Sequence, residues 1–318
     1  MYFNENDAYV ENLITEWEKI ITPVPQFSEN VKILQIKYSE QDKKIMNIFR
    51  AVLLSKEISL RVYDLTSLVL SLFPTNYACW VLRRECLDKV KEIDPNQELV
   101  WLDDIMVENQ KNYQIWHHRK LLIEKINDAS HEKKILNDVF LTEPKNFHAW
   151  THRIWMIRRF NNVEGEFDFI EDMLKNDIKN NSVWNYRFFL VQFNNNNKLD
   201  KETVEKEIKY ALNKIKINPN NECPYCYIRG FINKSGFKYN DFSFVKEELE
   251  KNVKTKDNNS YGLMLLLDYY EEEKNKEKFE EIIAKLIKVD YIRKKYYRWR
   301  KENSFLKENR KYKIYFII

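Results

Sequence analysis

Glycine is scarce in this sequence, with four residues in 318, and proline is little more common, with seven. Phosphate-binding loops need closely spaced glycines, so the Walker and dinucleotide-binding motifs are excluded and any phosphate must be held by side chains. No run of about eighteen apolar residues occurs, which argues against a membrane span. Charged residues make up 32% and hydrophobic residues 44%, a balance that favours long amphipathic helices joined by short turns.

Cysteine is also rare, at positions 79, 86, 223 and 226. So few cysteines in a chain of this length do not suggest a disulfide framework, and no signal peptide opens the sequence, so a reducing cytoplasm is expected. Cys223 and Cys226 form CPYC, a spacing found in zinc and redox sites, but no second ligand pair lies nearby. His148 and His152 lie one helical turn apart, yet the segment reads HAWTH and lacks the glutamate of HExxH. We therefore predict no metal site in this chain.

A repeated motif organises the rest of the chain. Segment 112–120 reads NYQIWHHRK and segment 146–154 reads NFHAWTHRI; they share Asn, Trp four residues later and Arg three residues after that. The same pattern starts at Asn76 and Asn180, and a degenerate copy with Tyr in the Trp position starts at Asn221. The spacings of 36, 34, 34 and 41 residues match a pair of helices with its turns, which predicts a helical-repeat protein.

Each residue of the motif has a physical reason. Asn accepts hydrogen bonds from the free N–H groups of a first helical turn, so each copy is predicted to start a helix. Pro74, Pro144 and Pro219 lie one or two residues before their Asn and stop the preceding helix. Trp and Arg share a face, where the indole fills the space between hairpins and the guanidinium bonds to carbonyls of the neighbouring repeat. Trp and Arg are therefore expected to be scaffold, and function to lie between Asn and Trp.

Helical patterns also flank the motif copies. Two prolines in ITPVPQ at 21–26 impose an extended passage after the first helix, and Ser39 and Asp42 offer a cap for the next one. The flanking helical patterns cover 8–20, 45–53, 58–72, 261–273, 278–288 and 293–300. We predict one all-α domain over 1–318, with N-terminal helices in 1–73, five repeats in 74–240, and a divergent repeat, cap and basic tail in 241–318.

The net charge of +4 is unevenly placed along the chain. From Lys285 onward there are twelve Lys or Arg against three acidic residues, a local charge of +9. A basic tail can meet nucleic acid or an anionic membrane. No basic aromatic platform or reading-helix motif accompanies it, so we interpret it as a solvated last helix and predict no nucleic-acid partner.

The motif copies, together with PVPQ at 23–26, YSE at 38–40 and FRAVL at 49–53, resemble the alpha subunit shared by protein farnesyltransferase and protein geranylgeranyltransferase type I. The resemblance runs from about Trp17 to Arg300. The Rab geranylgeranyltransferase alpha subunit has similar repeats, but PVPQ followed by YSE and FRAVL favours the farnesyl and type I branch. The resemblance implies an α-α superhelix, a right-handed solenoid of antiparallel helical hairpins, that wraps around a separate beta subunit.

The resemblance also implies a function. An enzyme of this family transfers a farnesyl or geranylgeranyl group from its diphosphate to a cysteine thiol near the C-terminus of a CaaX protein. The beta subunit is expected to hold the catalytic zinc and the isoprenoid pocket, magnesium to accompany the diphosphate, and this chain to bind no cofactor itself. Two alternatives stay open: a Rab-type alpha subunit, which requires an escort protein, and a non-enzymatic helical-repeat scaffold, which would explain the helices but not PVPQ and YSE.

The same resemblance places the catalytic residues at the N-terminal ends of the motif helices. Lys111 matches the lysine that reaches the leaving diphosphate, and Tyr113 matches the tyrosine beside that diphosphate. His148 matches a residue of the shell that supports them. A cation at the leaving group would stabilise the transition state more than the ground state, because negative charge builds there as the bond breaks.

The expected substrate-binding residues lie beside these three. Gln114 matches the glutamine that binds the CaaX carboxylate, Tyr77 matches an aromatic residue of the peptide and prenyl groove, and Asn146 belongs to the supporting shell. The chain departs from the family at Phe147, where Tyr is common, so a hydroxyl at the phosphate end of the site is missing. It also departs at Pro224-Tyr225, which is expected to bend the fifth motif helix and weaken its packing.

Overall fold

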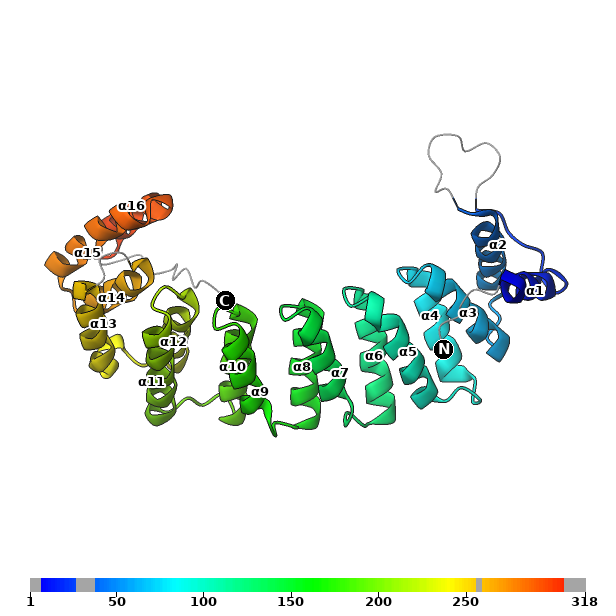
Figure 1. The fold of residues 1–318 in the computed structure, drawn as a ribbon, viewed down its shortest axis with the longest axis horizontal. Helices are drawn as coiled ribbons and strands as arrows, with labels where there is room; N and C mark the ends of the chain where they lie inside the picture. The colour runs from blue at the N-terminus through cyan, green and yellow to red at the C-terminus, as the bar shows by residue number, and fades with distance from the viewer. Residues whose placement is uncertain (1–6, 27–37, 256–258, 306–318) are drawn as a thin grey trace. The chain divides into compact units, whose positions relative to one another are not determined.

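A computed structural model describes residues 7–26, 38–255 and 259–305 of the chain. Within these ranges the protein is all α, with sixteen α-helices, two short 3-10 helices and no strand (Figure 1). The chain divides into two compact units, Met1–Asn161 and Asn162–Ile318, and the boundary falls between the third and fourth motif copies. The helical class of the fold is thereby confirmed, while the single-domain organisation stays a prediction.

The described residues of unit 1 form eight helices, of which α3 pairs with α4, α5 with α6 and α7 with α8. Their bounds are α1 (Asp7–Glu18), α2 (Glu40–Ser55), α3 (Leu60–Leu72), α4 (Tyr77–Lys89), α5 (Pro95–Glu108), α6 (Tyr113–Ile126), α7 (Glu132–Thr142) and α8 (Phe147–Phe160). The motif helices α4, α6 and α8 also contact one another in sequence, α4 with α6 and α6 with α8. Unit 1 is therefore a stack of helical hairpins.

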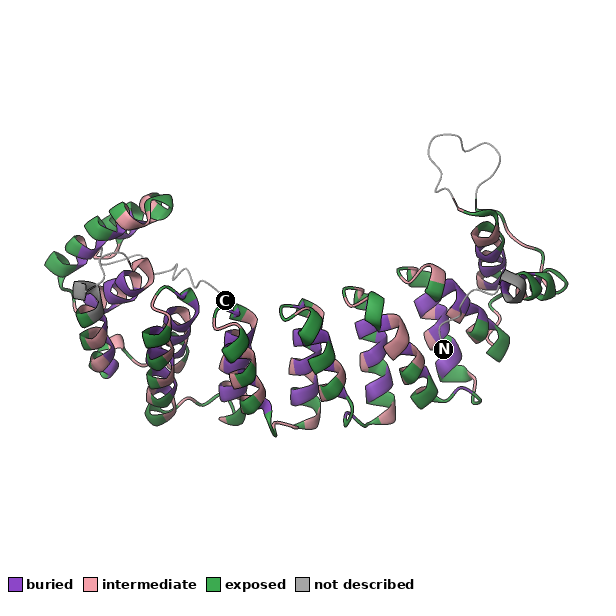
Figure 2. Cartoon of the chain, viewed as in Figure 1, coloured by how far each residue is buried: buried purple, intermediate pink, exposed green. Residues whose placement is uncertain are grey.

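Unit 2 continues the same pairing, α9 with α10, α11 with α12, α13 with α14 and α15 with α16. The bounds of its helices are α9 (Glu166–Asn176), α10 (Asn181–Asn194), α11 (Lys201–Ile217), α12 (Glu222–Ser235), η1 (Tyr239–Phe242), α13 (Ser243–Thr255), α14 (Ser260–Glu272), α15 (Lys276–Val289), η2 (Tyr291–Arg293) and α16 (Lys294–Asn303). In both units the motif helices bury the sides that face their neighbours, and their turns are mostly exposed (Figure 2).

The N-terminal segments contain the predicted cap and a contact that the sequence did not predict. Ser39 caps α2, because its hydroxyl accepts a hydrogen bond of 3.0 Å from the backbone N–H of Asp42. The PVPQ segment lies against this helix, where the Val24 carbonyl accepts a bond of 3.0 Å from Nε of Arg50. Two of the segments that carry the resemblance are thus in direct contact. Residues 27–37, between them, lie outside the described residues.

All five motif Asn residues cap a helix, as predicted. In each copy a four-residue turn comes first, closed by a bond of 2.9–3.2 Å from the Asn backbone N–H to the carbonyl three residues earlier. The Asn side chain then accepts from a backbone N–H of the first helical turn. The capping residues are Asn76, Asn112, Asn146, Asn180 and Asn221.

The same Asn residues also tie successive repeats together through a shared carbonyl. In unit 1 the Gln110 carbonyl accepts from Nε1 of Trp116 in its own repeat, at 2.8 Å, and from Nδ2 of Asn146 in the next repeat, at 3.1 Å. The Pro74 carbonyl does the same for Trp80 and Asn112. Each of these oxygens accepts two hydrogen bonds. Asn112 and Asn146 therefore bond to the preceding repeat as well as capping a helix, which the sequence did not reveal.

Unit 2 has the same shared carbonyls and one further motif Asn. The Ile178 carbonyl accepts from Nε1 of Trp184 and Nδ2 of Asn221, and the Pro219 carbonyl accepts from the Tyr225 hydroxyl and Nδ2 of Asn259. Asn259 also caps α14, so it is a sixth copy of the Asn that sequence analysis missed. The missing Trp and Arg in that copy explain why.

The fifth motif helix is not broken by its proline. Helix α12 runs without interruption from Glu222 to Ser235, and Pro224 lies in its first turn, where a backbone N–H has no helical partner to lose. Both Pro224 and Tyr225 are buried. In place of an indole N–H, the Tyr225 hydroxyl donates to the Pro219 carbonyl at 2.9 Å, so this repeat keeps the hydrogen bond that Trp makes in the other copies.

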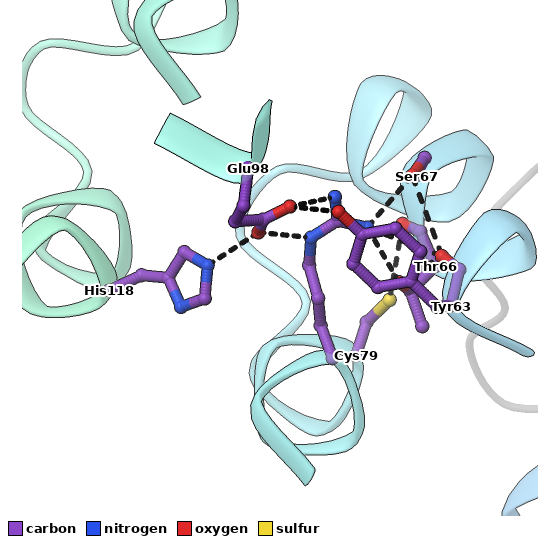
Figure 3. Close-up of polar contacts among 7 residues, drawn as sticks. Tyr63, Thr66, Ser67, Cys79, Glu98 and His118 are labelled. Carbon is purple, nitrogen blue, oxygen red and sulfur yellow. Dashed lines mark hydrogen bonds and ion pairs between the residues drawn. The ribbon is translucent and has the colours of Figure 1, made fainter. Parts of the chain in front are cut away.

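Three motif Arg residues, at 83, 119 and 187, bond chiefly to buried glutamates, not to carbonyls as predicted. In unit 1 the Arg83 guanidinium donates to both Glu98 oxygens at 2.5 and 2.6 Å, and Glu98 also accepts from Nε2 of His118 in the next repeat (Figure 3). Arg83 keeps a single carbonyl bond, to Tyr63 at 3.2 Å. A bidentate bond to carboxylate is stronger than bonds to carbonyls, which favours this arrangement. We call each such Arg–Glu–His or Arg–Glu–Tyr set a carboxylate link.

The carboxylate links recur with a changed third member. In unit 1, Glu132 joins Arg119 to His152, the latter at 2.7 Å. In unit 2, Glu207 joins Arg187 to the Tyr227 hydroxyl, which donates at 2.6 Å. Tyrosine thus takes the place that histidine has in unit 1, and each link spans two neighbouring repeats.

Burial and charge set the protonation of the unit 1 links. Burial alone would raise the pKa of Glu98, but the Arg83 charge and the His118 hydrogen bond outweigh it and lower that pKa to about 2. The pKa of Glu132 is lowered to about 2 in the same way, by the bonds from His152 and Arg119. Burial lowers the pKa of both His118 and His152. Each link therefore consists of one buried ion pair and a neutral imidazole that donates through Nε2.

Candidate functional site

The predicted site residues collect at one edge of unit 1, at the N-terminal ends of α4, α6 and α8. These three helices are neighbours, and the shared carbonyls of Pro74 and Gln110 tie their turns together. Tyr77 begins α4, Tyr113 begins α6, and Phe147 begins α8. The repeat architecture therefore brings together residues that are about 35 positions apart in the sequence.

Lys111 lies in the turn that precedes α6, and its side chain is 77% exposed. Its Nζ lies 2.9 Å from Oε1 of Glu143, in the corresponding turn before α8. The backbone on either side is held, because Asn112 N–H bonds to the Asn109 carbonyl at 2.9 Å and the Gln110 carbonyl accepts two donors. Lys111 thus lies on a held turn, with an exposed side chain whose ammonium is paired with Glu143.

Three exposed aromatic rings follow the motif caps of unit 1 in the same register. Tyr77, Tyr113 and Phe147 are 60%, 62% and 74% exposed, although each is the first residue of a helix whose other aromatic residues are mostly buried. Exposed rings at equivalent positions of adjacent helices form an apolar surface that typically marks a binding site. The structure thus presents Tyr77 and Tyr113 to solvent, where a ligand or partner can reach them.

Gln114 differs from these residues because it is almost fully buried, at 3% exposure. Its Oε1 accepts a hydrogen bond of 3.1 Å from Nη2 of Arg84 on α4. This bond uses the carbonyl oxygen of the amide, so a bound carboxylate would need the amide N–H groups of the same side chain. Arg84 is a neighbour of the site that the sequence did not single out.

Asn146 and His148 lie at the start of α8. Asn146 is buried, its Oδ1 accepts from the Ala149 N–H, and its Nδ2 donates to the Gln110 carbonyl and to Oε2 of Glu143. These bonds suit a supporting role. His148 is half-buried with its ring 5.6 Å from that of Phe147, in an edge-on arrangement. The ligand contacts expected of both residues stay predictions.

The two motifs weighed as metal sites have other partners. His152 is buried in the carboxylate link to Glu132, so it does not converge with His148. The Sγ of Cys223 lies 3.5 Å from the Lys179 carbonyl, and burial raises the pKa of this thiol to about 11, which disfavours the thiolate that a metal requires. Among the described residues no group of three or more His, Cys, Asp or Glu side chains could hold a metal ion.

The basic C-terminal stretch is described as far as residue 305. Several of its cations are paired: Arg293 with Asp290 at 2.8 Å, and Arg300 with Asp268 at 3.0 Å. Arg300 thus attaches the last helix, α16, to α14, and the interpretation of the basic stretch as solvated stays a prediction. Residues 306–318 lie outside the described part of the chain. In the described ranges, no helix has the length and apolar character needed to cross a membrane.

Glu143 is the site residue that sequence reasoning missed. The sequence identifies Glu143 only as the residue before Pro144, which ends the preceding helix. Its carboxylate bonds to both Lys111 and Asn146, at 2.9 and 3.2 Å, and so connects two neighbouring turns. The available signal was its position, three residues before a motif Asn and 32 residues after the lysine, which is close to one repeat length.

Comparisons with known proteins agree with this architecture. Residues 95–126, 130–160 and 163–194 match the family described as protein prenyltransferase alpha subunit repeat. A Dictyostelium discoideum protein farnesyltransferase/geranylgeranyltransferase type-1 subunit alpha is 37% identical over 308 residues, which cover 93% of this chain and 95% of that relative. The corresponding Schizosaccharomyces pombe subunit is 35% identical over 112 residues, only 38% of its length.

A solved structure gives the same result for the fold. Candida albicans protein geranylgeranyltransferase-I complexed with GGPP contains a chain that superposes with a TM-score of 0.82 at 28% identity, covering 90% of this chain and 98% of that one. The fold and repeats thus define the class, a prenyltransferase alpha subunit of helical repeats. With the near full-length match to the Dictyostelium protein, the chain belongs to the family of protein farnesyltransferase/geranylgeranyltransferase type-1 alpha subunits.

Proposed function

We propose that this chain is the alpha subunit of a heterodimeric CaaX protein prenyltransferase. Such an enzyme transfers farnesyl or geranylgeranyl from its diphosphate to a cysteine thiol near the C-terminus of a target protein. The observation that carries the proposal is the edge formed by Lys111, Tyr113 and Tyr77, exposed at turns that the shared carbonyls of Pro74 and Gln110 tie together. Family membership supports the same reading.

The role proposed for Lys111 follows from its exposure and its fixed turn. As the substrate thiolate bonds to the first carbon of the prenyl group, the bond from that carbon to the diphosphate oxygen breaks and the electron pair leaves with the diphosphate. The Lys111 ammonium, on its exposed side chain, would stabilise that developing charge. Tyr113, which is separated from Lys111 only by the cap residue Asn112, would donate its hydroxyl to the same group.

The remaining residues fit supporting or recognition roles. Tyr77 would offer its exposed ring to the peptide and prenyl groove, and Gln114 would donate its amide N–H groups to the CaaX carboxylate while Arg84 holds its oxygen. Zinc, proposed for the beta subunit, would lower the pKa of the substrate thiol, and magnesium would accompany the diphosphate.

Reconstitution with candidate beta subunits tests the proposal. The chain is co-expressed with each beta subunit, and transfer of labelled farnesyl or geranylgeranyl to a CaaX protein is compared with transfer to a variant whose cysteine is Ser. CaaX-dependent transfer supports the proposal. Transfer only to a Rab protein in the presence of its escort would support the Rab-type alternative, and assembly without any transfer would support a scaffold.

A further inference from the structure

Glu143 places a carboxylate beside Lys111, although an anion-binding site would not be expected to contain one. Its Oε1 lies 2.9 Å from Nζ of Lys111, and its side chain is 34% exposed. Its Oε2 accepts from Nδ2 of Asn146 at 3.2 Å, and the same Nδ2 donates to the Gln110 carbonyl at 3.1 Å. The carboxylate is therefore held from its own turn and directed at the lysine of the neighbouring one.

We infer that Glu143 is a positioning residue that holds the Lys111 ammonium when the diphosphate site is empty and competes with diphosphate for it. This inference rests on the proposed function, because it takes Lys111 as the group that meets the leaving diphosphate. The structure supports it through geometry: one carboxylate bonds to the lysine and to the buried Asn146 that ties the two turns together.

The strength of the contact decides what it can do. An ion pair between partly exposed groups is weak, so a diphosphate with several negative charges can take Lys111 from a single carboxylate. The same carboxylate remains close to the bound anion and repels it, which weakens the binding of diphosphate both as part of the substrate and as the released product. Glu143 would thus keep the lysine oriented while preventing tight retention of the product.

The test measures inhibition of the assembled heterodimer by inorganic pyrophosphate. In E143Q the amide keeps an oxygen for Asn146 and loses only the charge, so inhibition should become up to about five-fold tighter, the upper range for an exposed ion pair. The turnover number should fall, though less than in K111A, because Lys111 loses the carboxylate that orients it and pyrophosphate is released more slowly. The difference should shrink at high salt, since the charges are partly exposed.

Matched controls separate this effect from a general change in charge. Glu205 forms a similar pair with Lys209 within α11, at 2.6 Å with side chains 38% and 61% exposed, so E205Q removes an equivalent charge away from the site. E205Q should leave pyrophosphate inhibition unchanged. In a K111A background, E143Q should tighten inhibition by no more than about two-fold, because the competition for the lysine is gone.

The outcomes are distinct. Unchanged inhibition in E143Q, or an equal shift in E205Q, would overturn the role of Glu143 while leaving the proposed function intact. Absence of prenyl transfer in the unmodified heterodimer with every beta subunit would instead contradict the proposed function. If E143Q does not assemble, E143D keeps the charge on a shorter side chain; tighter pyrophosphate inhibition in E143D supports the inference, and unchanged inhibition overturns it.

Discussion

The motif helices of the two units share one scaffold but differ in what they expose. Both units have Asn caps and shared carbonyls, and both join neighbouring repeats through buried glutamates. In unit 1 the residue after the motif Asn is Tyr77, Tyr113 or Phe147, whereas in unit 2 it is Asn181, Glu222 or Ser260. The third member of the carboxylate link changes as well, from His to Tyr. The caps, shared carbonyls and buried glutamates thus stabilise the repeats in both units. The residues that follow the motif Asn differ, and they distinguish unit 1 as the candidate site.

The largest predicted effect concerns the carboxylate links. Glu98→Ala leaves Arg83 buried without a carboxylate, which should cost about 3–5 kcal/mol of unfolding free energy. Glu207→Ala should cost less, because Arg187 keeps Glu171 at 3.2 Å. Hydrogen exchange of the assembled complex, resolved to peptides of each unit, measures both. Equal losses would show that the second carboxylate does not compensate.

The next effect concerns chemistry. Lys111→Ala should leave the heterodimer assembled and slow the single-turnover rate by about 30- to 1000-fold, equivalent to about 2–4 kcal/mol of transition-state stabilisation. Lys179 has the same turn position in the fourth copy, so Lys179→Ala is the matched control and should keep the rate. A normal single-turnover rate in the first variant would remove Lys111 from the mechanism.

A smaller effect is the difference in stability lost when a motif Asn, or an Asn that only caps a helix, is replaced by Ala. Asn221→Ala removes a cap and a buried bond of 2.8 Å to the Ile178 carbonyl, so about 2–3 kcal/mol of stability should be lost. Asn275 caps α15 through Lys278 N–H, and Asn275→Ala should cost about 1 kcal/mol. Urea unfolding of the two variants in the assembled complex gives the comparison. Similar losses would mean that the bond between repeats adds little.

The smallest effect is a difference in pH dependence between the units. Burial lowers the pKa of His118 and His152, so below about pH 6.5 the unfolded state binds more protons than the folded one and unit 1 loses stability, by up to about 1.4 kcal/mol per pH unit for each group. In unit 2, burial raises the pKa of Tyr227 well above 10. Its contribution is therefore kept on the acid side and lost above about pH 10. Peptide-resolved hydrogen exchange at matched unfolding conditions should show unit 1 weakening relative to unit 2 as the pH falls from about 6.5 to about 5; equal weakening of both units in that range would contradict the assignment.

The helical array could be predicted because its signals are local. An Asn cap, a preceding Pro and a Trp at fixed spacing act within one turn and one helix, so their pattern predicted where each motif helix begins. The buried glutamates could not be found this way. They lie 15, 13 and 20 residues after their Arg partners, and on an amphipathic helix each resembles a solvated residue until its partner from another repeat is known.

The candidate site was predictable only in part for a related reason. Lys111, Tyr113 and Gln114 came from the family resemblance, and the structure adds where they lie and what holds them. Glu143 and Arg84 act across repeats, so no spacing within one copy predicts them. Their contacts depend on how the hairpins stack, which the sequence of a single motif does not contain.

The shared carbonyls also restrict where the chain can change length. Gln110 and Ile178 lie inside four-residue turns in which a single inserted residue would separate an oxygen from both of its donors. The longest repeat, of 41 residues, gains its extra residues beyond the opposite end of its motif helix, in the loop after Asn194 and in α11. Insertions that arise in relatives should therefore accumulate at that far edge, and the edge that carries Lys111 should keep its length.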